Sequence, residues 1–153
     1  GSKGPNRFDC SGFMQYIFNH FSYSLNASSA SQYLQGISVK DEEICRGDLV
    51  FFKGRNSRRS NVGHVGLVTE VYPDGRFKFI HASTSQGIRE DWNFSPYYAQ
   101  RYVGARRIYF VQIDKRLILD AILELEDIDD NTPFTETEKS ITPQEFSTFV
   151  RAE

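Results

Sequence analysis

Apolar side chains recur at helical spacing near the start of the chain. Phe13, Ile17 and Phe21 follow one another every four residues, so their side chains share one face of a helix. This pattern predicts a helix over residues 9–21. A second, shorter helix is predicted over residues 27–35, because a glycine follows this segment and glycine commonly ends helices.

Farther along the chain, apolar and β-branched residues form short runs that are separated by turn residues. Such runs predict strands, here over residues 49–52, 63–71, 76–82 and 102–111. A Pro-Asp-Gly turn at residues 73–75 joins the second and third strands into a hairpin. Two helices ahead of a run of antiparallel strands predict an α+β fold.

Composition narrows the class of protein. The 153 residues suit one folded domain with an appendage. Apolar residues make up 39% and charged residues 25%, a balance that excludes a disordered chain. The sequence has no stretch near the ~20 apolar residues of a transmembrane helix. The net charge of −2 gives no general attraction to nucleic acid.

Charge divides the chain into two parts. Residues 1–110 carry 14 basic and 9 acidic side chains, whereas residues 111–153 carry 4 and 11. We therefore expect a domain over 1–110 and an acidic C-terminal extension over 111–153. Within the extension, residues 116–125 fit either a helix or a strand, residues 127–139 an exposed linker, and residues 143–151 a short terminal helix. The extension serves either as an interaction segment or as a packing element.

Cys10 is the first candidate for chemistry. It follows Asp9, a good N-cap residue, and so lies in the first turn of the predicted helix. Backbone N–H groups and the helix dipole stabilise a thiolate at such a position. The structural alternative is a small buried apolar side chain. With Cys45, which we expect to be structural, it forms one disulfide bridge or stays free.

Two histidines lie at the ends of the predicted hairpin strands. With residues 72–75 as the loop, Gly66 faces His81, and His64 lies one same-face step away, at about 6.6–6.8 Å. Gly66 leaves room for the two imidazoles to meet. Each histidine taken alone is better explained by a structural role. Together with Cys10, however, they match a nucleophile, a base and an orienting group.

Five segments of the chain also match the motifs of one family, in order. They are FDCSGF at residues 8–13, RGDLVFF at 46–52, GHVGL at 63–67, FIHAS at 79–83, and YY at 97–98 followed by RYVGARR at 101–107. Together they resemble the NlpC/p60 cysteine peptidases, over roughly residues 4–110. One such motif is weak support, but five in the same order are specific.

The resemblance implies a papain-like NlpC fold of the α+β class, with N-terminal helices packed on an antiparallel sheet. It implies that the cysteine at the helix N-terminus faces two sheet histidines, forming a catalytic triad of Cys10, His64 and His81. The activity it implies is a cysteine endopeptidase that hydrolyses peptidoglycan stem peptides through an acyl-enzyme. The bond most often cut in the family joins γ-D-glutamate to the diamino acid.

The resemblance also implies what binds to the domain and where it acts. Asp9 and Ser11 are expected to line the substrate cleft, and we expect Gly63 to bind substrate as well. The implied partners are peptidoglycan stem peptides or muropeptides, not nucleic acid, and the implied location is extracytoplasmic. No metal and no organic cofactor is implied.

Two departures from the family pattern keep other functions open. Arg46 stands where proline is usual, and the tyrosine segment that commonly precedes the FDCSG box is missing, so we expect the N-terminal edge to be truncated. One alternative is therefore a non-catalytic or truncation-inactivated relative that binds peptidoglycan. A zinc site built from Cys10, His64 and His81 is another. The third is an acyltransferase or amidase that uses the same thiol.

Two further segments fit either a structural or a functional role. Arg55, Arg58 and Arg59 form a basic loop that is either solvated or in contact with anionic cell-wall material. Residues 92–94 are expected in a loop, where they either wall the cleft or plug the end of the sheet.

Overall fold

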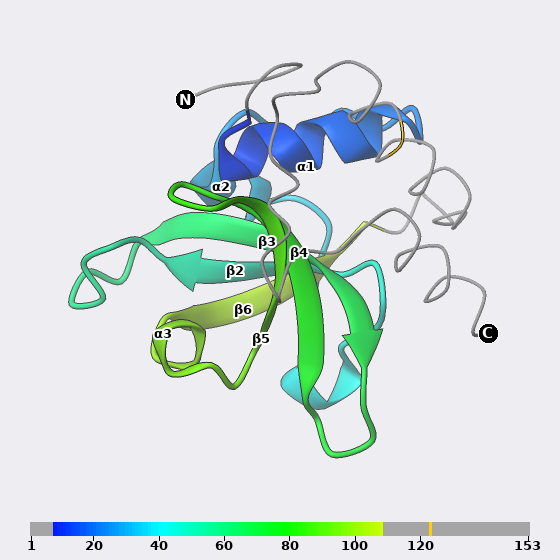
Figure 1. The fold of residues 1–153 in the computed structure, drawn as a ribbon. Coiled ribbons are helices and arrows are strands. Elements are labelled where there is room, and N and C mark those ends of the chain that lie inside the picture. Colours follow the sequence, from blue (N-terminus) through cyan, green and yellow to red (C-terminus); the bar gives the residue numbers. More distant parts are fainter. Residues whose placement is uncertain (1–7, 109–122, 124–153) are drawn as a thin grey trace.

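The computed structural model describes residues 8–108 and residue 123. The acidic extension and the helix predicted over residues 143–151 lie outside this part of the chain. Within it, two helices cover one face of a six-stranded antiparallel sheet, as Figure 1 shows. This arrangement confirms the α+β fold class.

The sheet is not in chain order. Its strands are arranged β1-β6-β2-β3-β4-β5, so the last strand lies between the first two. The elements are α1 (Cys10–Asn19), α2 (Ser29–Gln32), β1 (Ile37–Val39), the 3-10 helix η1 (Asp41–Glu43), β2 (Leu49–Lys53), β3 (Val62–Val71), β4 (Phe77–Ser83), β5 (Gly87–Trp92), α3 (Pro96–Ala99) and β6 (Tyr102–Arg107).

Helix α1 begins as predicted and ends earlier than predicted. The Asp9 carboxylate caps it by accepting the N–H of Gly12 at 2.6 Å. Its apolar face is fully buried on the sheet through Phe13, Met14, Ile17 and Phe18. The prediction of a helix to residue 21 was wrong, because the chain turns at Ser22, whose φ of 58° is left-handed and does not continue a helix.

The second helix is also shorter than the predicted range of 27–35. Ser28 accepts the N–H of Ser31 and so starts the helix later, and only one turn, Ser29–Gln32, follows. The buried amide of Gln32 donates to the backbone oxygen of Ser11 at 3.1 Å. This bond ties α2 to the first turn of α1, where Cys10 lies.

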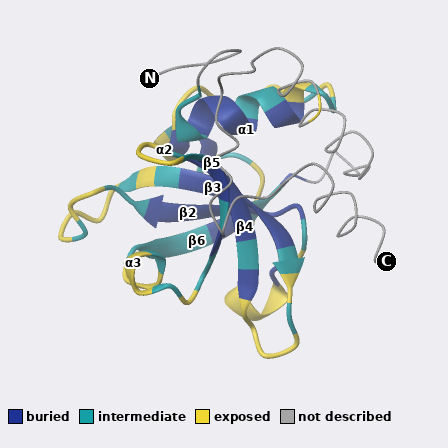
Figure 2. Cartoon of the chain, in the orientation of Figure 1, coloured by how far each residue is buried: buried dark blue, intermediate teal, exposed yellow. Residues whose placement is uncertain are grey.

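The sheet curls strongly around a second core. The rings of Phe77 in β4 and Tyr102 in β6 are only 6.3 Å apart, although β2 and β3 lie between these strands. In a flat sheet the two strands would be about 14 Å apart, three spacings of roughly 4.8 Å. Phe52 and Phe79 are fully buried inside the curl, and Figure 2 shows the central strands as largely buried.

The hairpin that carries both histidines has a longer turn than predicted. Val71 pairs with Phe77, so five residues rather than four make the turn, and strand β4 begins one residue late. A bulge between Val68 and Glu70 then shifts the register, so that Leu67 pairs with Ile80. Continued by one residue, that register places Gly66 opposite His81, as expected from the sequence.

Three short elements and one strand were not predicted. The short elements are β1, η1 and α3, and the strand is β5, whose sequence GIREDW lacks an alternation of apolar and polar residues. Residue 92 therefore ends a strand instead of lying in a loop. Trp92 stacks between Tyr72 and Phe94, with Arg76 over all three rings, so this segment packs at the turn end of the hairpin.

One ion pair joins two of the sequence motifs. The guanidinium of Arg107 in β6 donates to both oxygens of the buried Asp48 carboxylate, at 2.8 and 3.0 Å. The same carboxylate accepts the N–H of Cys45 at 2.8 Å. Asp48 thus fixes the start of β2 against the end of β6. Cys45 is exposed and both cysteines are free thiols.

We predict that Gly66→Ala destabilises the domain. A Cβ at this position would lie 2.7 Å from Phe79 Cδ2, 3.1 Å from the Ile80 carbonyl oxygen and 3.3 Å from His81 Cβ. We expect a loss of about 1–3 kcal/mol, the usual cost of overpacking. Chemical denaturation measures it. The control Gly54→Ala, whose Cβ meets nothing closer than 3.8 Å, should be near neutral; equal losses in both variants would contradict the packing argument.

Candidate active site

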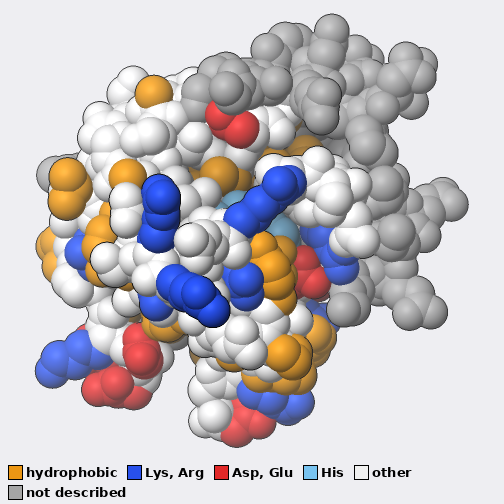
Figure 3. All heavy atoms as spheres, turned by 90° about the vertical axis from the view of Figure 1, so that its left-hand side faces the viewer, with side chains coloured by type: hydrophobic (Ala, Val, Ile, Leu, Met, Phe, Trp, Pro, Cys, Tyr) orange, Lys and Arg blue, Asp and Glu red, His pale blue; other side chains and the backbone are white. Residues whose placement is uncertain are grey.

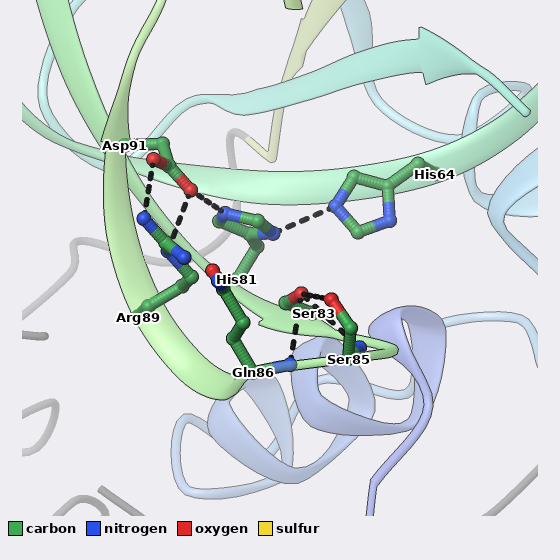
Figure 4. Close-up of polar contacts among 7 residues, drawn as sticks. All are labelled: His64, His81, Ser83, Ser85, Gln86, Arg89 and Asp91. Carbon is green, nitrogen blue, oxygen red and sulfur yellow. Dashed lines mark hydrogen bonds and ion pairs between the residues drawn. The ribbon is translucent and has the colours of Figure 1, made fainter. Parts of the chain in front are cut away.

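The two predicted histidines are in direct contact. His64, in β3, and His81, in β4, lie side by side, and His64 Nε2 is 2.8 Å from His81 Nδ1 (Figure 4). The rings are perpendicular, with centroids 4.9 Å apart. Gly66 makes this possible, since a side chain there would meet His81.

Strand β5 extends this contact into a chain of hydrogen bonds. The other nitrogen of His81, Nε2, is 2.8 Å from Asp91 Oδ2. Arg89 donates from Nη2 to Asp91 Oδ1 at 3.1 Å, and its Nε lies 2.9 Å from Oδ2. His81 is fully buried, and Asp91 and Arg89 are buried as well. Figure 4 shows the four side chains connected in order, from Arg89 through Asp91 and His81 to His64.

This chain determines where the protons of the two imidazoles reside. The Asp91 carboxylate only accepts, so His81 carries its proton on Nε2. His81 Nδ1 is then an acceptor, and the proton between the rings belongs to His64 Nε2. His64 Nδ1 is therefore left without a proton, which is the form of a ring nitrogen that can act as a base.

Both imidazoles are neutral near pH 7. Burial, and secondly the neighbouring imidazole of His81, lower the pKa of His64 from 6.5 to about 3. Burial also lowers the pKa of His81, against the opposing hydrogen bond and charge of Asp91. Aromatic rings surround the pair: Tyr98 stacks 6.2 Å from His64, and Phe79 lies 4.9 Å from His81.

Cys10 lies beside the same strand as His64. Its thiol packs against the core between α1 and the sheet. The backbone of Val65, the residue that follows His64, favours the thiolate form. The backbone N–H groups of Cys10 and Ser11 at the start of α1 also favour the thiolate. Within the described residues, no hydrogen bond joins the thiol to the His64 ring.

The expectation of a thiolate stabilised by the helix start needs correction. Burial is the largest influence on Cys10 and raises its pKa above the ordinary 9.0, and the nearby Asp9 carboxylate raises it further. The hydrogen bonds from Val65 and from the first turn of α1 lower it, but by less. The resting Cys10 side chain is therefore a neutral thiol.

A cavity of about 540 Å³ opens next to His64. Its walls come from the end of β2 and the loop after it, the start of β3, the β4–β5 turn, β5 and α3. Figure 3 looks onto this face, where a histidine lies in a hollow bordered by Lys and Arg side chains. Gly63, Lys53 and Arg55 line the cavity, so the basic loop is partly a wall of this site.

The predicted substrate-binding residues fall in two places. Gly63 lines the cavity, and a Cβ there would lie 2.7 Å from Gly54 Cα, so only glycine fits. Asp9 and Ser11 do not line it. They lie at the start of α1 beside Cys10, where the Ser11 hydroxyl donates to Asp9 Oδ1 at 3.3 Å. The exposed Arg58 and Arg59 do not line the cavity either.

The zinc alternative does not fit this geometry. Both ring nitrogens of His81 are already engaged, one by His64 and the other by Asp91. Among the described residues, no group of three or more His, Cys, Asp or Glu side chains is arranged to hold a metal ion.

Sequence reasoning missed Asp91 and Arg89. Both lie in β5, which pairs His81 with Arg89 and Phe79 with Asp91. Its three consecutive charged residues do not alternate with apolar ones, and a strand is recognised from the sequence by alternation of apolar and polar residues. The available signal was the two-residue spacing of Arg89 and Asp91, which places both side chains on one face of a strand.

Comparison with known proteins assigns the chain to a family. The sequence model of the NlpC/P60 family matches residues 1–107. The chain belongs to the NlpC/P60 family. An NlpC/P60 lipoprotein-like structure from Staphylococcus aureus superposes with a TM-score of 0.58 at 30% identity, covering 71% of this chain and 35% of that one.

Two curated relatives carry names that describe an activity. The murein DD-endopeptidase MepS/murein LD-carboxypeptidase of Escherichia coli K12 is 36% identical over 109 residues, which are 71% of this chain and 53% of that protein. The gamma-DL-glutamyl hydrolase of Bacillus subtilis is 35% identical over 110 residues, 71% of this chain and 25% of that protein. The chain thus spans about half of the first relative and a quarter of the second.

In residues 8–108 and at residue 123, no helix is long and apolar enough to span a bilayer.

We predict that alkylation of Cys10 by iodoacetamide rises through a pKa above 9.0, because burial disfavours the thiolate. Peptide mass spectrometry follows Cys10 and the exposed Cys45 separately in the same samples, so Cys45 reports reagent access. A Cys10 pKa well below about 8.5 that is lost in His64→Ala would contradict the neutral pair and indicate a thiolate–imidazolium pair.

Proposed function

We propose that the chain is a cysteine endopeptidase that hydrolyses peptidoglycan stem peptides, with Cys10 as nucleophile and His64 as base. The observation that carries this proposal is the hydrogen-bond chain from Asp91 through His81 to His64, which leaves His64 Nδ1 unprotonated. Membership of a family whose named relatives are endopeptidases supports it.

Acylation proceeds from the neutral pair. His64 Nδ1 takes the Cys10 proton as the sulfur attacks the carbonyl carbon, so the thiolate forms only with substrate bound. Backbone N–H groups at the start of α1 hold the oxyanion. The tetrahedral intermediate collapses to a thioester, and the same proton passes from His64 to the departing amine.

Deacylation repeats these proton transfers with water. His64 Nδ1 takes a proton from water as the oxygen attacks the thioester carbonyl carbon, and then returns it to the Cys10 sulfur. The products are a free carboxylate and a regenerated thiol. His81 and Asp91 touch no reacting atom, and they act as positioning residues that hold the His64 tautomer.

The γ-D-glutamyl–diamino acid bond is our proposed point of cleavage. The family motifs favour it, and the name of the Bacillus subtilis relative describes action on γ-glutamyl bonds. The name of the Escherichia coli relative describes a DD-endopeptidase instead, which makes the D,D cross-link the bond to test against. Such a substrate implies an extracytoplasmic location, and the lipoprotein-like title of the Staphylococcus aureus neighbour agrees.

A second candidate function is binding without catalysis. The absence of a hydrogen bond between Cys10 and the His64 ring, within the described residues, favours it. A binding module and a peptidase differ in turnover, which the first experiment below measures.

We predict that the full chain cleaves a synthetic stem peptide at the γ-D-glutamyl–diamino acid bond and leaves a D,D cross-linked dimer intact. Mass spectrometry identifies the products. Cys10→Ala should abolish cleavage, whereas His20→Gln, whose imidazole bonds the Tyr16 carbonyl away from the site, should not. Cleavage of the cross-link alone would refute the bond assignment, and binding without turnover of either peptide would favour the second candidate.

We predict that Asp91→Asn lowers kcat by about 10²-fold, within the usual range for general acid–base catalysis, with little change in KM. Arg89 donates to position 91 and so turns the amide oxygen toward itself and the amide N–H toward His81. This reverses both tautomers and leaves a proton on His64 Nδ1, which then no longer accepts one.

The control for this prediction is Arg89→Gln. It keeps the Asp91 carboxylate as acceptor and should retain kcat while lowering the melting temperature. Asp91→Glu should recover part of the activity. An Asp91→Asn enzyme with unchanged kcat would show that the tautomer argument is wrong, and loss of kcat in Arg89→Gln would trace the effect to the ion pair instead.

A further inference from the structure

The charged side chains that line the cavity beside His64 are mostly cations. Lys53, Arg55 and Arg89 are its cations and Asp91 is its one acid among the described lining residues. The Asp91 carboxylate is already shared between Arg89 and His81. Within the described part of the chain, no carboxylate pairs with Lys53 or Arg55, and Lys53 Nζ donates to the neutral carbonyl of Ser57 at 3.3 Å.

The basic wall is held in place by another arginine. Arg101 donates from Nη2 to the Arg55 carbonyl at 3.2 Å and from Nη1 to the Tyr97 carbonyl at 3.0 Å. Its guanidinium also stacks 3.7 Å from the centre of the Tyr97 ring. The N–H of Lys53 bonds the Arg101 carbonyl at 2.7 Å. Two walls of the cavity, the loop after β2 and helix α3, are thus tied together before any ligand binds, which lowers the entropy cost of binding.

The proposed mechanism says which half of a substrate reaches this cavity. His64 gives its proton to the departing amine, so the leaving-group half lies on the His64 side. His64 lines the cavity. Cys10, Asp9 and Ser11 do not line it. The acyl half therefore lies along the start of α1, and the leaving half extends toward Lys53 and Arg55.

We propose that this cavity is an anion subsite in which Lys53 and Arg55 bind a free carboxylate on the leaving-group half of the peptide. This inference rests on the proposed function and adds a substrate class to it. A carboxylate at this position accepts charge-assisted hydrogen bonds from both cations. A carboxamide there has no charge and leaves the two cations unpaired, so the site discriminates between the two forms.

The test uses two synthetic stem peptides that differ only in a carboxylate or a carboxamide on the leaving-group half. We expect kcat/KM of the full chain to favour the carboxylate peptide by about tenfold, the size expected for two partly exposed ionic contacts. Lys53→Met/Arg55→Gln should remove this preference by raising KM for the carboxylate peptide. It should leave kcat almost unchanged, and also kcat/KM for the carboxamide peptide. The matched control Arg59→Gln removes an exposed arginine from the same loop and should keep the preference.

Binding to Cys10→Ala, measured by calorimetry with the same two peptides, separates this proposal from the proposed function. Preferential binding of the carboxylate peptide without turnover by the unmodified chain would support the subsite and refute the peptidase. Equal cleavage of both peptides would refute the subsite and leave the peptidase standing. A carboxylate preference that survives in Lys53→Met/Arg55→Gln would overturn the assignment to these two residues.

Discussion

The hydrogen bond between His81 and the Asp91 carboxylate is the constraint on which the site depends. A carboxylate accepts hydrogen bonds and does not donate them. It therefore determines which nitrogen donates and which accepts in His81 and then in His64. The imidazoles alone do not determine this, because a neutral ring donates equally well from either nitrogen. A carboxylate that is two hydrogen bonds away thus decides which ring nitrogen of His64 lacks a proton. Burial excludes water that would compete for these bonds.

The fold supplies this burial by curling its sheet. Inside the curl, Phe52 of β2, Phe79 of β4 and Tyr98 of α3 pack around the imidazoles. Burial here lowers the pKa of His64, and burial against the core between α1 and the sheet raises the pKa of Cys10. Both shifts favour the neutral forms of the pair. The N–H groups at the start of α1 do not outweigh the loss of hydration, so the resting Cys10 side chain stays a thiol.

Much of this site was predictable from the sequence, and the remainder depended on long-range pairing. Helical spacing located α1 and with it Cys10, and strand alternation placed His64 and His81 on one face. The adjacency of His64 and His81 was right although the predicted turn was one residue too short, because the bulge after Val68 restored the register. Nothing in the local sequence indicates that a bulge offsets the longer turn. Strand β5, and therefore Asp91 and Arg89, stayed hidden because its conformation comes from pairing with β4 rather than from its own pattern.

The position of β6 in the sheet has a consequence for how the chain folds during synthesis. Among the described strands, β6 is the last to be made, yet it lies between β1 and β2 and pairs with both. Until it emerges from the ribosome, those two strands have unpaired edges and Asp48 lacks its arginine. Closing the sheet therefore waits for contacts that span some seventy positions of sequence, and such distant pairing makes folding slow and cooperative. Nascent chains of this domain are exposed to aggregation through an open β2 edge from the synthesis of β2 until β6 has emerged.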